Sequence, residues 1–566
     1  MTKEFRFSLE YAVSGQAKVF DGWENDDFST IKEVSEEGVK VTLVPKKELQ
    51  LKNAYLKADY VFEGEDRIFV NGYQSWTTSR EYTKNDVQKG LLHLAKYQPV
   101  RSYSALFGDY DFQKYYSVPG KFHSYSYSYI NRKEEITLLG TLTERTGYTV
   151  IHYDIPANKI AFQKDVDGVT TAEEYLLFDL FFAEGAYDEV FDAYFKKLAL
   201  PPLKIKHMAG YTSWYNYYGG ITEEILNRDI DGLATVKESA DIFQIDDGYQ
   251  TKTGDWTSVK KDLYPHGMNY LTEKIHRKGF KAGLWLAPFN AAKSSRVFAE
   301  HPDWFIKDAK GKYQLGSIAW GGAYTLDFYI KEAADYIRNF FNVVLNEWNF
   351  DMVKLDFLYS VCQTPRHNKS RGQIMCEAMD FLRECVGEKL LLGCGVPLFP
   401  AFGKVDACRI SCDVGASFLP PWYNSTLNHE LPSTRCAMIN TIFRRHLNGR
   451  AFVNDPDVFY LRDSDVRKFD KLAVRKSKLK FNEEQKITHA TINNMCGDVL
   501  FVSDNVGDFD DERRKLLKKF FRPTSKKVTK AQYVSKDEIE IYYTEKDKRF
   551  RMLVNLHTGK NITQKL

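Results

Sequence analysis

The stretch YIKEAADYIRNFFNVVLNEWNFDMVKLDF, residues 329–357, contains the pattern that decides the fold. Apolar side chains recur at helical spacing through its first part, which predicts a helix over residues 329–348. Asn349 is suited to end that helix, and Met352–Leu355 is a short apolar run typical of a buried strand. Asp356 follows the strand directly. A helix, a turn, a strand and a carboxylate thus succeed one another.

Units of this kind recur on both sides of the stretch. Eight short strands are predicted, and helical sequence separates most of them. They are Met208–Ser213, Asp241–Ile245, Phe280–Leu286, Met352–Leu355, Lys389–Gly393, Asp406–Ile410, Ala451–Val453 and Val499–Val502. Both a doubly wound sheet and a (β/α)8 barrel are built from such an alternating series of strands and helices. Eight units over roughly 300 residues favour the barrel, so we expect a central TIM-type barrel over residues 205–521.

The sequence on either side of the predicted barrel shows patterns typical of β-strands. Before it, short β-branched and aromatic segments separated by turn residues predict an N-terminal β-sandwich over residues 1–200. These segments are Phe5–Phe7, Val39–Leu43, Tyr60–Phe62, Arg67–Val70, Ser124–Ile130, Ile136–Leu139 and Thr149–Ile155. After it, alternation in Glu538–Tyr543 and Arg549–Val554 predicts a small C-terminal antiparallel β domain over residues 525–566. The expected fold class is therefore multidomain, α/β plus β.

The composition argues against several classes of protein. The net charge is only +3 and no segment concentrates Lys and Arg without matching acids, so nucleic acid is not an expected partner. The amino terminus lacks a signal-peptide pattern and no window is long enough to cross a bilayer, so no membrane partner is predicted. All 8 Cys lie between Cys362 and Cys496 without a CxxC pair, which predicts reduced thiols and a cytoplasmic protein. The 12 His are scattered without HExxH, and neither a metal nor a cofactor is predicted.

Polar and aromatic side chains gather just past the ends of the predicted strands. In a barrel these ends form one face, which carries the active site. The residues, in chain order, are Trp214, Asp246, Asp247, Trp285, Asp356, Asp413, Asp455 and Asp457. Glycoside cleavage needs two carboxyl groups that flank one bond, about 5–5.5 Å apart in retaining enzymes. Lys354 points to the same side of its strand as Asp356 and could keep that carboxylate ionised.

The segment Met352-Val-Lys-Leu-Asp-Phe357 resembles the nucleophile motif of glycoside hydrolase family 36, the α-galactosidases or melibiases. Further segments resemble motifs of that family in the same order. They are Asn71-Gly-Tyr-Gln-Ser-Trp76, Gly210-Tyr-Thr-Ser-Trp-Tyr215, Gln244-Ile-Asp-Asp-Gly248, Gly254-Asp-Trp256, Gly283-Leu-Trp-Leu-Ala-Pro288, His301-Pro-Asp-Trp304, Arg409-Ile-Ser-Cys-Asp413 and Asn454-Asp-Pro-Asp457. The resemblance spans most of the chain and is densest from Gly210 to Arg462.

The resemblance implies a retaining glycoside hydrolase that cleaves terminal α-galactosidic bonds of oligosaccharides. Asp356 is the implied nucleophile, forming a covalent galactosyl intermediate, and Asp413 is the implied general acid/base. The side chains implied to bind substrate are Trp76, Trp214, Asp246, Asp247, Trp256, Trp285, Lys354, Cys394, Arg409 and Asp457. The implied partner is a small oligosaccharide or glycoside, and relatives of this kind are often homo-oligomers.

Individual polar contacts also follow from the resemblance. Asp246 and Asp247 are implied to hold the galactose 4- and 6-hydroxyls, Lys354 the 3- and 4-hydroxyls, and Arg409 the 2-hydroxyl. Asp455 is interpreted as structural, because an acid before a proline more often shapes a turn.

The aromatic side chains are assigned in the same way. Trp214 and Trp285 are implied to line the sugar pocket, with Asp457 near it. Trp256 and Trp76 are implied to form walls of the leaving-group site.

Two departures from the family pattern leave alternatives open. Gly395, in the segment Cys394–Phe399, offers no side chain where relatives often read the 2-position, so an α-N-acetylgalactosaminidase remains an alternative. Phe357 stands where many α-galactosidases place Asn, so contact with the leaving group can differ. A galactosyl-transferring enzyme is a further alternative. A non-catalytic sugar-binding protein is less favoured, because both Asp356 and Asp413 are present.

Overall fold

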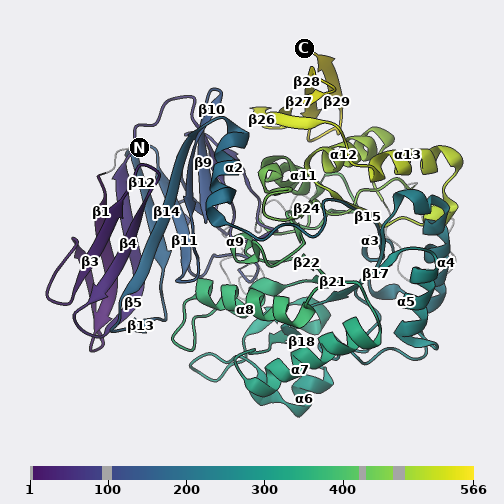
Figure 1. Ribbon diagram of the computed structural model, residues 1–566, viewed down its shortest axis with the longest axis horizontal. Helices are drawn as coiled ribbons and strands as arrows, with labels where there is room; N and C mark the ends of the chain where they lie inside the picture. Colours follow the sequence, from purple (N-terminus) through teal and green to yellow (C-terminus); the bar gives the residue numbers. More distant parts are fainter. Residues whose placement is uncertain (1–3, 92–104, 420–428, 463–478) are drawn as a thin grey trace. The chain divides into compact units, whose positions relative to one another are not determined.

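The computed structural model describes residues 4–91, 105–419, 429–462 and 479–566, which divide into two compact units (Figure 1). Unit one comprises Met1–Pro201, Val361–Asp380 and Pro397–Phe402. Unit two comprises Pro202–Ser360, Phe381–Val396 and Gly403–Leu566. The predicted domain limits, 1–200, 205–521 and 525–566, stay predictions.

Unit one contains two antiparallel sheets of seven strands each. The first sheet has the order β2 (Gln16–Asp21), β1 (Arg6–Val13), β5 (Leu49–Asp59), β12 (Lys159–Asp165), β11 (Tyr148–Asp154) and β8 (Lys121–Tyr125), with β13 (Thr170–Thr171) also paired to β5. The second has the order β3 (Phe28–Val34), β4 (Gly38–Pro45), β14 (Tyr175–Gly185), β10 (Glu135–Thr141), β9 (Tyr127–Arg132), β6 (Arg67–Val70) and β7 (Arg80–Tyr82). Helix α2 (Tyr187–Leu198) follows β14.

Alternation along the strands builds one core between these sheets. Phe7, Leu9 and Tyr11 of β1 are buried, and Val41 and Leu43 of β4 belong to the same hydrophobic cluster. Successive side chains of a strand point to opposite faces, so each sheet contributes one apolar face to the cluster. This arrangement is the β-sandwich expected from the sequence.

Two strand predictions in unit one are wrong in detail. Tyr60–Phe62 forms no strand; it follows the end of β5, and its two aromatic rings pack together at 4.8 Å. Ser124–Ile130 is not one strand but the end of β8 and the start of β9, in different sheets. The break is at Ser126, whose φ of +66° turns the chain and whose hydroxyl donates to Glu144 at 2.8 Å.

Unit two contains a parallel sheet in which all eight predicted barrel strands are present. Its order is β24 (Val453–Asp455), β23 (Ala407–Arg409), β22 (Leu390–Gly393), β21 (Met352–Leu355), β17 (Lys281–Leu286), β16 (Ile242–Ile245), β15 (Met208–Thr212) and β25 (Val499–Val502). The segment that follows β24 contacts the other outer strand, since the Phe459 N–H donates to the Phe501 carbonyl of β25 at 3.0 Å and Phe459 pairs with Val502 in an isolated parallel bridge. The sheet is therefore a nearly closed barrel.

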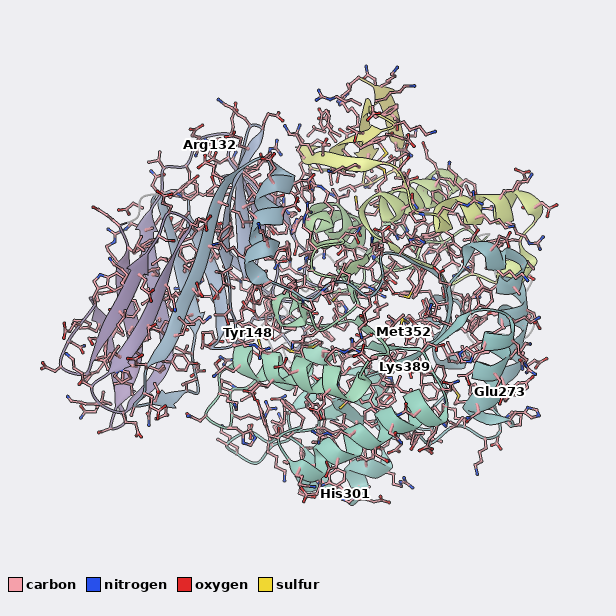
Figure 2. All side chains as sticks on the ribbon, viewed as in Figure 1. Arg132, Tyr148, Glu273, His301, Met352 and Lys389 are labelled. Atoms are coloured by element: carbon pink, nitrogen blue, oxygen red, sulfur yellow. The ribbon has the colours of Figure 1, made fainter. Side chains whose placement is uncertain are left out.

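Helices cover the outside of this barrel, as Figure 1 shows. Within unit two they include α4 (Glu223–Leu233), α5 (Gly267–Arg277), α7 (Lys331–Asn342), α11 (Thr434–Phe443), α12 (Glu483–Cys496) and α13 (Asp511–Phe521). The residues of α8 (Arg371–Val386) are divided between the units. Figure 2 shows the two environments: Met352 of β21 lies inside, whereas Glu273 of α5 is exposed.

The helix that precedes β21 largely matches its prediction. Helix α7 begins at Lys331 rather than at Tyr329, and a wider π-type turn, Val343–Glu347, continues it. Its buried face is the predicted apolar stripe. Asn349 adopts a φ of +61°, which ends the helix and directs the chain into β21.

Two small sheets complete unit two. One is formed by β18 (Asn290–Ala292), β20 (Ala323–Thr325) and β19 (Leu315–Ser317), all between β17 and β21 in the chain. The other is the expected C-terminal antiparallel sheet of β26 (Lys527–Ser535), β27 (Glu538–Glu545), β28 (Lys548–Asn555) and β29 (Asn561–Lys565). Across the described residues, the helices are all too short or too polar to span a bilayer.

Candidate active site

The carboxyl ends of the barrel strands bring most of the predicted site residues to one rim. Because all neighbouring strands of the barrel are parallel, these ends share one face. The rim residues are Asp246 and Asp247 after β16, Trp285 in β17, Lys354 and Asp356 at β21, Cys394 after β22, Arg409 and Asp413 at β23, and Asp455 and Asp457 at β24.

Asp356 is held by two N–H donors at the end of β21. The backbone N–H of Phe357 donates to its Oδ1 at 2.8 Å, and Trp285 Nε1 donates to its Oδ2 at 3.1 Å. Burial raises the pKa of Asp356, and the charge of Asp413 raises it further, whereas Lys354 opposes the rise. The two carboxyl groups thus lie within electrostatic range of each other, with one carboxylate fixed in orientation.

Cys394 lies beside the same carboxylate. Its side chain has no exposed surface, and its thiol lowers the pKa of Asp356 through a hydrogen bond. Burial raises the pKa of the Cys394 thiol well above its usual value, so the thiol keeps its proton and remains a donor.

Lys354 places a buried positive charge between two carboxylates. Its Nζ donates to Asp246 Oδ2 at 3.0 Å, and the same oxygen accepts from Gln244 Nε2 at 2.8 Å. Burial lowers the pKa of Lys354, but the carboxylates of Asp246 and Asp356 raise it more, so the net shift is upward. Lys354 therefore stays charged and acts on Asp356 as a cation.

Arg409 joins three carboxylates on the opposite side of the rim. Its Nη1 donates to Asp413 Oδ1 at 3.0 Å, and its Nε donates to Asp455 Oδ2 at 3.3 Å. Its Nη2 lies 2.9 Å from Asp457 Oδ1. The Asp413 side chain is 39% exposed, against 3% for Asp455 and 0% for Asp457. Of these three acids, Asp413 is the one that solvent or a ligand can reach.

Asp457 fixes the backbone next to Asp413. Its Oδ2 accepts from the N–H of Val414 at 2.9 Å and from the hydroxyl of Tyr215. Burial raises its pKa to about 6, the charge of Asp413 adds to the rise, and Arg409 opposes it. Its carboxylate thus contacts Arg409 and the residue after Asp413, and its part in substrate binding stays a prediction.

Asp247 is held from outside the strand by two donors that the sequence did not predict. Gln250 Nε2 donates to its Oδ1 at 2.5 Å, and Trp320 Nε1 donates to its Oδ2 at 2.8 Å. Trp320 lies in the turn between β19 and β20. The sequence signal that could have indicated this turn is the Trp-Gly-Gly run at 320–322, because glycines mark a backbone of unusual geometry.

The predicted tryptophans are placed differently from one another. Trp214 is half-buried and its ring contacts Tyr218 at 5.2 Å. Trp256 has no exposed surface, and its ring packs edge-on against Trp285 with the ring centroids 5.7 Å apart. Its role as a wall of the leaving-group site stays a prediction. Trp76 belongs to unit one, where it packs near Phe107, and its role at the site stays a prediction.

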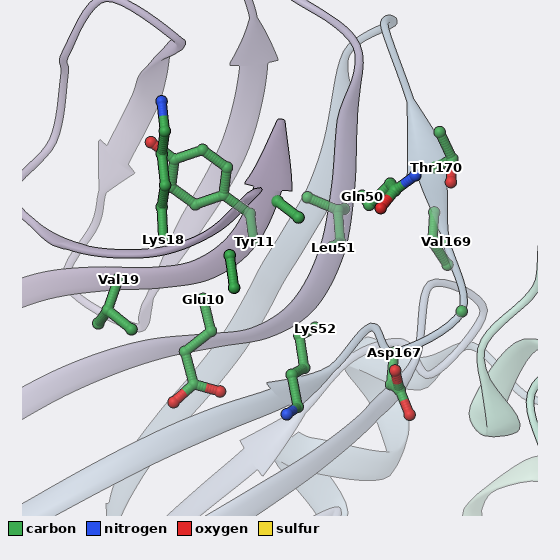
Figure 3. A pocket seen from close by; sticks show the side chains of 13 residues that line it. Glu10, Tyr11, Lys18, Val19, Gln50, Leu51, Lys52, Asp167, Val169 and Thr170 are labelled. Atoms are coloured by element: carbon green, nitrogen blue, oxygen red, sulfur yellow. The ribbon is translucent and has the colours of Figure 1, made fainter. Parts of the chain in front are cut away.

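A groove in unit one provides a contrast (Figure 3). It is lined by parts of β1, β2 and β5 and by residues 167–170. Its aromatic residue, Tyr11, is only 4% exposed, and the Tyr11 hydroxyl donates to Asp27 at 2.8 Å. The groove therefore offers no free aromatic face for a sugar, and the barrel rim remains the favoured site.

A nearly closed parallel barrel with acids, a buried lysine and tryptophans at the carboxyl ends of its strands is an arrangement typical of barrel glycosidases. Residues 216–381 match the melibiase family model. The A type blood alpha-D-galactosamine galactosaminidase of Flavonifractor plautii is 29% identical over 182 residues, 28% of this chain and 17% of that protein. Alpha-galactosidase Mel36A of Lactobacillus acidophilus is 27% identical over 151 residues, 25% of this chain and 20% of that protein.

Solved structures share the fold over nearly the whole chain. TtGalA, an alpha-galactosidase from Thermus thermophilus, has a TM-score of 0.69 at 22% identity over 94% of this chain and 100% of that chain. The GH36 alpha-galactosidase AgaA of Geobacillus stearothermophilus has a TM-score of 0.59 at 12% identity, over 98% and 78%. The matched segments cover only about a fifth of the two curated relatives, 17% and 20% of their lengths. The match to the melibiase family model is confined to residues 216–381 of this chain.

Proposed function

We propose that the protein is a retaining glycoside hydrolase that cleaves terminal α-galactosidic bonds, with residues 205–521 as its catalytic barrel. Asp356 is the proposed nucleophile and Asp413 the proposed general acid/base. The observation that carries the proposal is the setting of Asp356: two N–H donors orient it, Lys354 lies beside it, and the charge of Asp413 reaches it. The match of residues 216–381 to the melibiase family model supports the galactoside assignment.

In the first step an oxygen of Asp356 attacks the anomeric carbon of the galactosyl group. The bond to the leaving oxygen breaks as Asp413 transfers its proton to that oxygen. The N–H donors of Phe357 and Trp285 hold the attacking carboxylate in place, so little reorganisation is needed during attack. The Asp413 carboxylate that remains is stabilised by Arg409 at 3.0 Å.

In the second step the roles of the two acids reverse. Asp413 removes a proton from water, the water oxygen attacks the anomeric carbon, and Asp356 leaves. Two displacements at one carbon return the original α configuration. The partial exposure of Asp413 supports this role, because that acid must meet both the leaving group and the incoming water.

The sugar is proposed to sit against the polar groups of β16 and β21. Asp246, Asp247 and Lys354 lie together at one part of the rim. The two acids are assigned to the 4- and 6-hydroxyls, and Lys354 is assigned to the 3- and 4-hydroxyls. Arg409 is assigned to the 2-hydroxyl, since its contacts with three carboxylates use three of its five N–H groups and leave two for a ligand. Trp214 and Trp285 are proposed to line the pocket.

A second candidate substrate is an α-linked 2-amino sugar. Gly395, with a φ of +55°, follows Cys394 and itself carries no side chain that would exclude a larger 2-substituent. The Flavonifractor relative is named as a galactosaminidase. Small oligosaccharides are the proposed natural substrates, since TtGalA was solved with stachyose and with p-nitrophenyl α-D-galactopyranoside. A cytoplasmic homo-oligomer remains part of the proposal.

The proposal is tested by steady-state hydrolysis of p-nitrophenyl α-galactoside, with the α-N-acetylgalactosaminide, the α-galactosaminide and the α-glucoside in parallel. We expect the galactoside to be cleaved with the highest kcat/KM. Preference for either 2-amino sugar would overturn the galactoside assignment and keep the mechanism. Galactosyl transfer to added sugars in preference to water would identify a transferase. Binding without turnover of any of the four would refute the enzymatic proposal.

Replacing Lys354 with Met should move the acidic limb of the pH profile of kcat/KM to higher pH. Burial raises the pKa of Asp356, and the Lys354 cation is the largest influence that lowers it, so removal of the cation raises this pKa further. Asp356 must be ionised to attack, so acid inactivates the variant at a higher pH than the wild type. The kcat/KM profile reports these ionisations in the free enzyme.

The matched control is Lys260→Met. Lys260 also carries a cation near the rim, but its Nζ donates to the Gly248 carbonyl at 2.6 Å and its charge acts on Asp247. We expect the acidic limb of this control to stay in place. An unshifted limb in Lys354→Met would show that Lys354 does not set the ionisation of the nucleophile.

A further inference from the structure

Trp320 adopts a backbone conformation that a bulky residue rarely accepts. Its φ is +57°, in the left-handed region, and Gly321 and Gly322 follow with φ values of +77° and +96°. For an aromatic residue this is an outlier that persists only where the surroundings hold it, and such outliers cluster at functional sites. The turn thus holds the Trp320 side chain in one position at the cost of strain in its backbone.

The Trp320 ring is held against the residues that surround the nucleophile. It meets Phe357 edge-on at 5.1 Å and Trp285 at 6.0 Å. Phe357 directly follows Asp356 and itself has a φ of +55°, and Trp285 donates to the Asp356 carboxylate. Trp320 therefore connects the Asp356 part of the rim with the Asp247 part.

The Trp320 indole N–H fixes one oxygen of Asp247. Trp320 Nε1 donates to Oδ2 at 2.8 Å, and Gln250 Nε2 donates to Oδ1 at 2.5 Å. A carboxylate has about four acceptor sites, so each oxygen can still accept a hydroxyl of a ligand. With one donor on each oxygen the plane of the carboxylate is set. Only a hydroxyl in the matching position then gains a good hydrogen bond.

We propose that Trp320 determines specificity at the sugar hydroxyl that Asp247 binds, by fixing the orientation of that carboxylate and closing the rim beside it. This inference rests on the proposed glycosidase function and adds a positioning residue to it. Trp320 acts through Asp247, so its loss should change discrimination between sugars rather than the chemical step.

The test compares kcat/KM for p-nitrophenyl α-galactoside with its 4-deoxy and 6-deoxy analogues. Asp247→Asn identifies the hydroxyl concerned, as the one whose removal no longer matters in that variant. Trp320→Phe keeps a ring and removes the N–H. We expect it to reduce discrimination at that same hydroxyl by about tenfold, the scale of one hydrogen bond to a charged group. Trp320→His, which keeps a ring N–H, should retain more of the discrimination than Trp320→Phe.

The matched control is Trp304→Phe. Trp304 is also half-buried in unit two, but its ring stacks on His301, which lies at the periphery (Figure 2). Its discrimination ratios should equal those of the wild type. If Trp320→Phe lowers kcat/KM equally for all three sugars, or does not lower it, the proposal is overturned and Trp320 has only a packing role. If the wild type cleaves none of the three sugars, the proposed function fails instead.

Discussion

Asp356→Ala is expected to lower kcat for p-nitrophenyl α-galactoside by at least about 10⁴-fold, as loss of a nucleophile does. The substitution removes the atom that forms the covalent bond, and Trp285 and Phe357 then have no carboxylate to orient. Azide can occupy the vacated space and attack the anomeric carbon from the same face. Added azide should therefore restore part of the rate, and NMR should identify the product as β-galactosyl azide, inverted relative to the substrate.

The control for this variant lies just before the same strand. Asp351 precedes the amino end of β21, where it accepts from His276 Nε2 and from the Ala282 N–H, both at 2.8 Å. Asp351→Asn tests whether an acid at the other end of the strand matters, and its kcat should stay near that of the wild type. Retained activity in Asp356→Ala, or α-galactosyl azide as the rescue product, would remove Asp356 from the nucleophile role.

Asp413→Ala is expected to cost roughly 10²- to 10⁴-fold in rate on galactosides with poor leaving groups, the usual range for a general acid. A dinitrophenyl leaving group needs no proton, so its release should be almost unaffected. The later attack of water still needs the base, so turnover should stall at the galactosyl enzyme. Azide needs no base and should release the sugar as α-galactosyl azide, the anomer opposite to that from Asp356→Ala.

Leaving-group dependence is the measurement that separates this role from a structural one. A plot of the rate of leaving-group release against leaving-group pKa should be steep for Asp413→Ala and shallow for the wild type. Arg409 loses one of its carboxylate partners in this variant, so thermal melting is needed to show that the barrel is intact. Equal losses for all leaving groups in a folded variant would contradict the acid/base assignment.

The barrel could be predicted in detail because its strands are buried on both faces. Each appears in the sequence as a short apolar run between helical segments, as in Met352–Leu355 after helix α7. The sandwich was predicted only as a class. An aromatic run such as Tyr60–Phe62 packs equally well in a loop, and Ser126 breaks an apparent strand through its own backbone turn.

The acids of the site were predictable because strand ends fix their position, and the structure places Asp246, Asp356 and Asp413 on one rim. Trp320 was not, because its turn has no periodicity, and its part in the site depends on a positive φ and a bond to Asp247. The burial of Trp256 against Trp285 was equally unpredictable, since a short sequence motif does not indicate which of two packed rings is the more exposed.

The proposed mechanism passes through a covalent bond between the sugar and Asp356. The most direct test incubates Asp413→Ala with dinitrophenyl α-galactoside, followed by proteolysis and mass spectrometry. Because this variant should form the intermediate quickly and release it slowly, we predict one galactosyl group per chain, on the peptide that contains Asp356 and on that residue. A galactosyl group on another side chain, or release of inverted β-galactose with no adduct at all, would contradict the mechanism.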